Sequence, residues 1–63
     1  MEYRIRESRE RAGMSQEQLS KKSGVSRAII SGLENGSITV TTTKTLSRIA
    51  EALGLKVSEI FLS

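Results

Sequence analysis

The sequence contains no cysteine, no histidine and no proline among its 63 residues. The missing cysteine excludes disulfides and thiolate metal sites. The missing histidine removes the commonest general base and the commonest metal ligand. The chain also lacks a glycine-rich phosphate-binding loop and the length to enclose a deep pocket. We therefore expect no enzyme activity, no catalytic residues, no metal or cofactor and no small-molecule substrate.

Long apolar segments are absent as well. No run approaches the roughly 20 apolar residues that span a bilayer, and no signal peptide is visible. These absences predict a soluble, cytoplasmic protein without membrane contact. We expect one domain, residues 1–63, and domains of this size bury only about 60% of their unfolded surface.

Glycines divide the chain into helical segments. Four of the five (Gly13, Gly24, Gly36 and Gly54) follow stretches of helix-forming residues, and glycine is favoured just after helix C-termini. No alternating strand pattern appears. The sequence therefore predicts an all-α fold, a compact bundle of five short helices. The predicted helices span about residues 2–12, 15–23, 27–35, 42–53 and 57–62.

Local patterns support these boundaries. Ser15 and Gln18 have the spacing of a capping box at the start of the second helix, and Thr42 is the expected N-cap of the fourth. The fourth helix has apolar residues at the i, i+3, i+4 and i+7 positions of one buried face. These residues are Leu46, Ile49, Ala50 and Leu53.

Two other segments have weaker apolar patterns. The first helix has a thin apolar face, with Ile5 and Ala12 at its ends and Ser8 between them. In the loop after the third helix, we expect Ile38 and Val40 to turn toward the core.

The stretch from residue 16 to residue 36 meets the requirements of a helix-turn-helix. A small residue, Ser20, stands where two helix backbones must cross closely. Gly24 follows four residues later, where the helix predicted over residues 15–23 must end and the chain must reverse. Apolar residues then return at helical spacing in the helix predicted over residues 27–35. The apolar residues of the unit are Leu19, Val25, Ile30 and Leu33.

This stretch resembles the DNA-binding unit of the phage repressor and Cro family, also called the Xre family. The matching residues are Gln16, Leu19, Ser20, Gly24, Val25, Ser26, Ile30, Leu33, Glu34, Asn35 and Gly36. The resemblance extends from Ile5, Arg6 and Arg9 to Ile60 and Phe61, although the family usually has a leucine near Ser8. It implies a lambda repressor-like fold and double-stranded DNA as the partner. It also implies a transcriptional regulator, most simply a dimeric repressor on a palindromic operator.

The charge distribution agrees with a DNA partner. The net charge of +3 is small, but five basic residues and one acid lie between residues 18 and 50. The third and fourth predicted helices have Arg27 and Lys44 near their N-termini and no acid there, against the preference set by the helix dipole. An external phosphate at these helix ends would explain the pattern, and drift on an exposed surface is the alternative.

The resemblance assigns a role to each candidate site residue. Arg27 is the expected base-contacting residue, because arginine donates two hydrogen bonds to guanine. Ala28 and Ile29 offer apolar contact to bases, although Ile29 could instead cover the core edge. Gly32 stands where the family often has a long polar side chain. The expected phosphate contacts are Gln16, Ser26, Ser31, Asn35 and Lys44, with local capping as the alternative for Gln16 and Asn35.

Two further sets are expected to be structural. The resemblance implies that Arg9 and Glu34 form an ion pair, at least partly buried, between the first and third helices, with a solvated surface charge as the alternative for Arg9. The apolar C-terminal residues Leu55, Val57 and Leu62 are the candidate homodimer contact, with completion of the monomer core as the alternative.

Other functions remain compatible with the fold. The chain could be a protein-interaction module or an antitoxin-type partner-binding protein that does not contact DNA bases. The sequence does not separate a phage repressor, a restriction-modification controller and an antitoxin.

Overall fold

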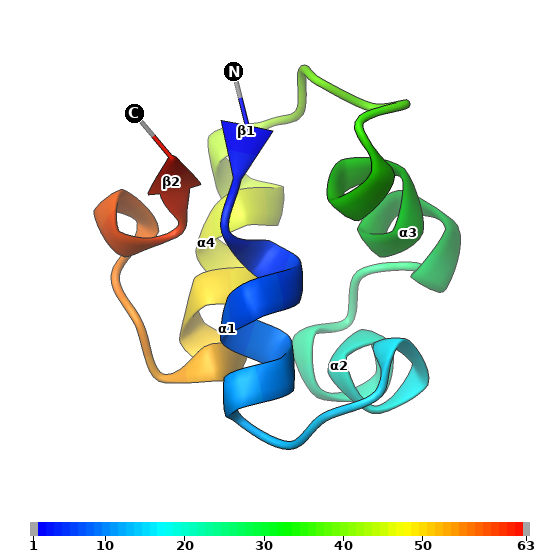
Figure 1. Cartoon of the computed structure of the whole chain (residues 1–63), viewed down its shortest axis with the longest axis vertical. Helices are drawn as coiled ribbons and strands as arrows, with labels where there is room; N and C mark the ends of the chain where they lie inside the picture. The colour runs from blue at the N-terminus through cyan, green and yellow to red at the C-terminus, as the bar shows by residue number, and fades with distance from the viewer. Residues whose placement is uncertain (1, 63) are drawn as a thin grey trace.

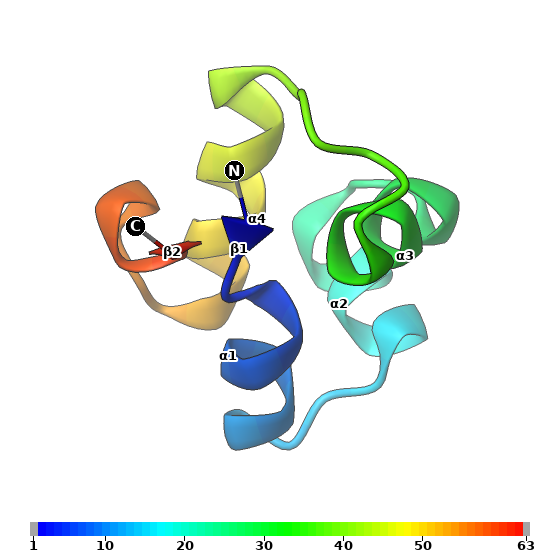
Figure 2. The ribbon, with the colours of Figure 1, turned by 45° about the horizontal axis from the view of Figure 1, so that its top comes forward.

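The computed structural model describes residues 2–62 and has four α-helices, one 3-10 helix and one short strand pair. The elements in order are β1 (Glu2–Tyr3), α1 (Ile5–Arg11), α2 (Gln16–Ser23), α3 (Arg27–Asn35), α4 (Thr43–Leu53), η1 (Val57–Glu59, the 3-10 helix) and β2 (Phe61–Leu62). In Figure 1 and Figure 2, α1 and α4 separate the α2–α3 pair from η1 and β2. The predicted all-α bundle is therefore confirmed, with a 3-10 turn as the fifth helix.

The predicted helix ends are set by their caps. The Ser15 hydroxyl accepts a hydrogen bond from the Gln18 amide (3.1 Å), and the Gln18 side chain accepts one from the Ser15 amide (2.8 Å). This is the predicted capping box. Gly24 ends α2 with a φ of 74°, which only glycine adopts without strain. Thr42 caps α4 by accepting a hydrogen bond from the Thr45 amide (3.1 Å).

The predictions for the two terminal helices were wrong in their bounds. Residues 2 and 3 were assigned to the first helix and residues 60–62 to the last, but β1 and β2 form an antiparallel pair. The Arg4 amide continues this pairing by donating to the Ile60 carbonyl (2.7 Å). The pairing joins residues nearly 60 positions apart, so helix propensity within either segment gave no sign of it.

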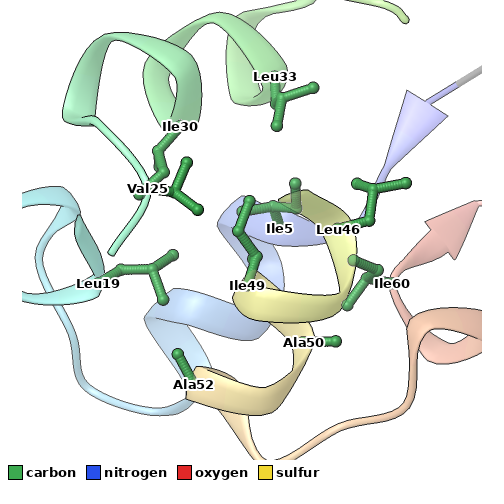
Figure 3. Close-up of a cluster of buried hydrophobic side chains, with 10 residues drawn as sticks. All are labelled: Ile5, Leu19, Val25, Ile30, Leu33, Leu46, Ile49, Ala50, Ala52 and Ile60. Atoms are coloured by element: carbon green, nitrogen blue, oxygen red, sulfur yellow. The ribbon is translucent and has the colours of Figure 1, made fainter. Parts of the chain in front are cut away.

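The core lies where α1, α2, α3 and α4 meet, as Figure 3 shows. The largest fully buried apolar side chains of the described residues are Ile5, Leu19, Ile30, Ile49 and Ile60. The stripe predicted on α4 faces this core, with Leu53 half-buried at its edge. Ala12 was expected on the buried face of the first helix, and this was wrong. It is exposed, because α1 ends one residue earlier and the chain turns away.

The loop from residue 37 to residue 41 was predicted only in part. Ile38 packs against the core, and its amide donates to the carbonyl of Gly32 (3.0 Å). Val40 was expected to turn inward but is 86% exposed. Because Ile38 already covers Gly32, the following residues pass over the surface. The Tyr3 hydroxyl holds this loop by donating to the Thr39 carbonyl (3.0 Å).

Candidate nucleic-acid interface

The turn between α2 and α3 is fixed by hydrogen bonds to one residue. The Ser20 hydroxyl donates to the Val25 carbonyl (2.7 Å), and the Ser23 hydroxyl accepts from the Val25 amide (3.2 Å). Val25 is itself buried in the core between α2 and α3. Both backbone groups of Val25, at the centre of the turn, are therefore hydrogen-bonded, which holds α3 in its orientation relative to α2.

The N-terminus of α3 is open to solvent. Ser26 caps the helix by accepting a hydrogen bond from the Ile29 amide (3.3 Å). Arg27 and Ala28 are exposed, whereas Ile29 is half-buried and packs against the core. The first turn contains no acid. The end of the helix thus presents a hydroxyl cap, a cation and partly positive backbone amides.

The N-terminus of α4 repeats this arrangement. Thr42 is the cap, Lys44 is exposed, and the first turn again contains no acid. Among the side chains that the structure describes, neither Arg27 nor Lys44 forms an ion pair. Both helix ends therefore have an unneutralised positive charge beside a capped N-terminus, which is a suitable environment for a phosphate.

An ion pair ties α1 to the far end of α3. The Arg9 guanidinium donates to both carboxylate oxygens of Glu34, from Nε (2.7 Å) and from Nη2 (3.0 Å). Its Nη1 donates to the Met14 carbonyl (2.7 Å). The Glu34 side chain is 0% exposed and that of Arg9 is 12% exposed. The pair therefore joins α1, the loop before α2 and α3 inside the protein.

Both groups of the pair have shifted pKa values. Burial opposes the charge on Glu34, but the hydrogen bonds from Arg9, Gln16 and Arg6 outweigh it and lower the pKa of this carboxyl. The hydrogen bond to Glu34 raises the pKa of Arg9, against the smaller effect of burial. Both side chains are thus charged at neutral pH.

Gln16 and Asn35 already make local hydrogen bonds. The half-buried Gln16 side chain donates from Nε2 to Glu34 Oε1 (3.1 Å). The exposed Asn35 side chain accepts from the Ser37 amide (2.9 Å). Each amide group keeps at least one N–H for an external acceptor. Ser31, the remaining candidate on α3, is half-buried.

Comparison with known proteins places this geometry in a family. A family model described as "Helix-turn-helix" matches residues 5–60, nearly the whole chain. The chain belongs to this helix-turn-helix family. The family is of the Xre and Cro type, and its members are DNA-binding transcription regulators.

The solved structures show the same fold in a larger protein. A chain of the "SinR protein/SinI protein complex" matches with a TM-score of 0.82 and 28% sequence identity. The match covers 86% of this chain and 52% of that chain, so this helix-turn-helix domain spans about half of that chain's length. None of the curated proteins matches.

The remaining candidate residues of the helix-turn-helix domain lie away from α3. Leu55 and Val57 are half-buried and pack against the core of the same molecule. The side chain of Leu62 lies outside the described part of the structure. Across residues 2–62 we find no cluster of acidic side chains that would hold a metal ion and no helix suited to crossing a membrane.

Two features were missed from the sequence alone. Gly32 is buried beneath Ile38, although the family often has a long polar side chain at this position. Arg6 was matched to the family without a role, yet its Nε donates to Glu34 Oε1 (3.3 Å). Packing reveals both features, because a side chain of the following loop covers Gly32 and Glu34 is 28 residues from Arg6.

Proposed function

We propose that this helix-turn-helix domain is a sequence-specific repressor that binds a palindromic operator in double-stranded DNA as a homodimer. The observation that supports the proposal is the matched pair of exposed, capped and positively charged N-termini on α3 and α4. In the proposed complex α3 lies in the major groove, with its N-terminal half toward the bases.

Base contacts are proposed for the first turn of α3. Arg27 donates two hydrogen bonds to the O6 and N7 atoms of a guanine, and Ala28 makes apolar contact with a thymine methyl group. Ile29 contributes only its exposed edge, because it also packs against the core. Since Gly32 is buried and has no side chain, only these few side chains of α3 contact bases directly. The shape of the DNA supplies the remaining specificity.

Phosphate contacts are proposed around this turn. Lys44 and the cap of α3, Ser26, contact the backbone on either side of the groove, together with Ser31 on α3. Gln16 and Asn35 contribute the amide N–H groups that their local hydrogen bonds leave available. These contacts position the domain without selecting a sequence.

A protein-interaction role is the second candidate function. Its support is that the similar SinR protein was solved in a complex with a second protein, the SinI protein, and that only a few side chains are available for base contact. Under this alternative, α3 keeps its fold but contributes no base preference.

Selection of bound duplexes from a random DNA pool separates the two candidates. We expect a palindrome with a conserved guanine in each half-site. Recovery of no common sequence at low salt would favour the protein-interaction role.

A further inference from the structure

Arg6 and Gln16 converge on a single oxygen atom. Arg6 Nε is 3.3 Å from Glu34 Oε1, and Gln16 Nε2 is 3.1 Å from the same oxygen. The two side chains come from α1 and from the first residue of α2. Because they share an acceptor, the Arg6 guanidinium lies beside the side chain that is proposed to contact a DNA phosphate.

The charges around Glu34 do not cancel. Two arginines surround one carboxylate, and the buried Arg9 already neutralises it through two hydrogen bonds. The Arg6 side chain is 56% exposed, so the surplus positive charge lies at the surface. Of its three guanidinium nitrogens, only Nε is hydrogen-bonded to another described residue, which leaves both terminal nitrogens available to a ligand.

Among the described side chains, no acid other than Glu34 forms an ion pair with Arg6. Glu10, one turn later on α1, acts electrostatically on Arg9 but lies beyond 4.0 Å of the Arg6 guanidinium. Glu17, in the first turn of α2, is directed to Lys21 (Oε1 to Nζ, 3.6 Å). The carboxylate within 4.0 Å of the Arg6 guanidinium is that of Glu34 alone, among side chains that the structure describes.

We propose that Arg6 is a further phosphate-binding residue of the interface, held by Glu34 beside Gln16. The inference rests on the proposed function. Arginine suits this role, because its planar guanidinium keeps one N–H on the buried carboxylate while its terminal N–H groups donate to a phosphate. The fixed position reduces the loss of side-chain freedom on binding.

The structure also supplies a matched control on the same helix. Arg11 is 78% exposed and pairs with Glu7 one turn earlier (Nη2 to Oε1, 2.9 Å). Replacing either arginine with glutamine removes one positive charge from α1. Only Arg6 lies beside Gln16. A difference in DNA binding between the two variants therefore reflects the position of the arginine, because both variants lose the same net charge.

The test measures binding to a random-sequence DNA duplex at several salt concentrations. We expect Arg6→Gln to lower the salt slope by about one relative to the wild-type chain, and Arg11→Gln to keep the wild-type slope. Raising the salt from 50 to 200 mM should therefore weaken DNA binding by Arg6→Gln about three times less than DNA binding by the wild-type chain. Arg6→Lys keeps the charge and should restore the slope.

Thermal unfolding of each variant distinguishes binding from folding. Equal slopes for Arg6→Gln and Arg11→Gln would overturn the inference, and so would a lowered melting temperature with an unchanged slope. Failure of Arg6→Lys to restore the slope would also count against it. If wild-type binding does not respond to salt at all, the proposed function itself fails, and this inference fails with it.

Discussion

Gly32 lies inside α3, where glycine costs roughly 1 kcal/mol of helix stability relative to alanine. The structure explains its presence. A Cβ atom at this position would lie 2.5 Å from Cδ1 and 2.6 Å from Cγ1 of Ile38. The Ile38 backbone is held in place by its hydrogen bond to Gly32. The glycine therefore allows the loop after α3 to close over the helix.

This packing predicts that the effect of Gly32→Ala changes sign with its neighbour. In the wild-type background the clash should exceed the gain in helix propensity and lower the free energy of unfolding by about 1 kcal/mol. In an Ile38→Ala background the two closest contacts are gone and only the contact with the Cβ atom of residue 38, at 3.2 Å, remains. The same substitution should then stabilise by less than about 1 kcal/mol. Urea unfolding of the four variants measures both effects. Equal effects in the two backgrounds would show that Ile38 does not restrict residue 32.

Arg9 is predicted to contribute strongly to stability. Arg9→Ala leaves the fully buried Glu34 carboxylate with only Gln16 and the exposed Arg6 as donors. Loss of one partner of a buried pair costs about 3 kcal/mol, and urea unfolding should show this decrease. The Arg9→Ala/Glu34→Ala double variant should lose much less than the two single losses combined. Additive and mild losses would mean that the two side chains do not interact.

Glu34 should also produce a specific dependence of stability on pH. The pKa of Glu34 is lowered in the folded protein. The ionised carboxylate therefore contributes fully to the free energy of unfolding above the ordinary glutamate pKa of about 4.3. The contribution is lost as the pH falls through the lowered folded pKa. The difference in unfolding free energy between wild type and Glu34→Gln should therefore be largest at neutral pH and shrink below about pH 4.3.

Glu7→Gln serves as the control for this pH dependence, because Glu7 forms an exposed ion pair with Arg11. Such pairs contribute about 0–1 kcal/mol, so the control should remain close to wild type throughout. A Glu34→Gln difference that stays constant from neutral pH to acid would contradict the assignment of the ionised carboxylate as the stabilising form.

At the scale of elements, the helices with local end signals were predictable. The bounds of α3 were predicted correctly, and the ends of α2 and α4 followed from Ser15, Gly24 and Thr42. The terminal segments were not predictable, because β1 and β2 depend on each other across the whole chain. The candidate site was also predictable only in part. The cations at helix ends can be identified from the sequence, whereas the convergence of Arg6 and Gln16 on Glu34 depends on packing.

The two charged helix ends predict different signatures for Arg27 and Lys44. Arg27→Ala should cost about 1–3 kcal/mol on the selected site and little on scrambled DNA, because a guanine contact is lost. Lys44→Ala should weaken binding to both duplexes alike and lower the salt slope by about one. Binding to both duplexes at several salt concentrations distinguishes these outcomes. Equal weakening of both duplexes by Arg27→Ala would make Arg27 a phosphate contact only.

At the scale of the whole molecule, the domain is too small to cover an operator alone. Its largest dimension is 24 Å, and successive major grooves on one face of DNA are about 34 Å apart. We therefore expect the proposed repressor to bind as two copies on adjacent half-sites. The surface that joins them is constrained by the monomer, because Leu55 and Val57 already pack partly against its core. Only the exposed parts of these two side chains remain for a dimer contact, and we expect weak association without DNA.

Operator spacing tests this arrangement without changing the protein. Two copies that touch each other on DNA require half-sites about one helical turn apart. Insertion of about five base pairs between the half-sites rotates one of them by about half a turn, since one turn is about 10 base pairs. We expect the cooperative two-copy complex to disappear and each half-site to bind independently with the affinity of an isolated half-site.

Analytical ultracentrifugation of the protein with the original and the lengthened duplex measures both stoichiometry and cooperativity. A half-site duplex is the control, because it should bind one copy whatever the dimer contact. Cooperative binding that persists after the insertion, or a one-to-one complex on the selected operator, would contradict the symmetric dimer.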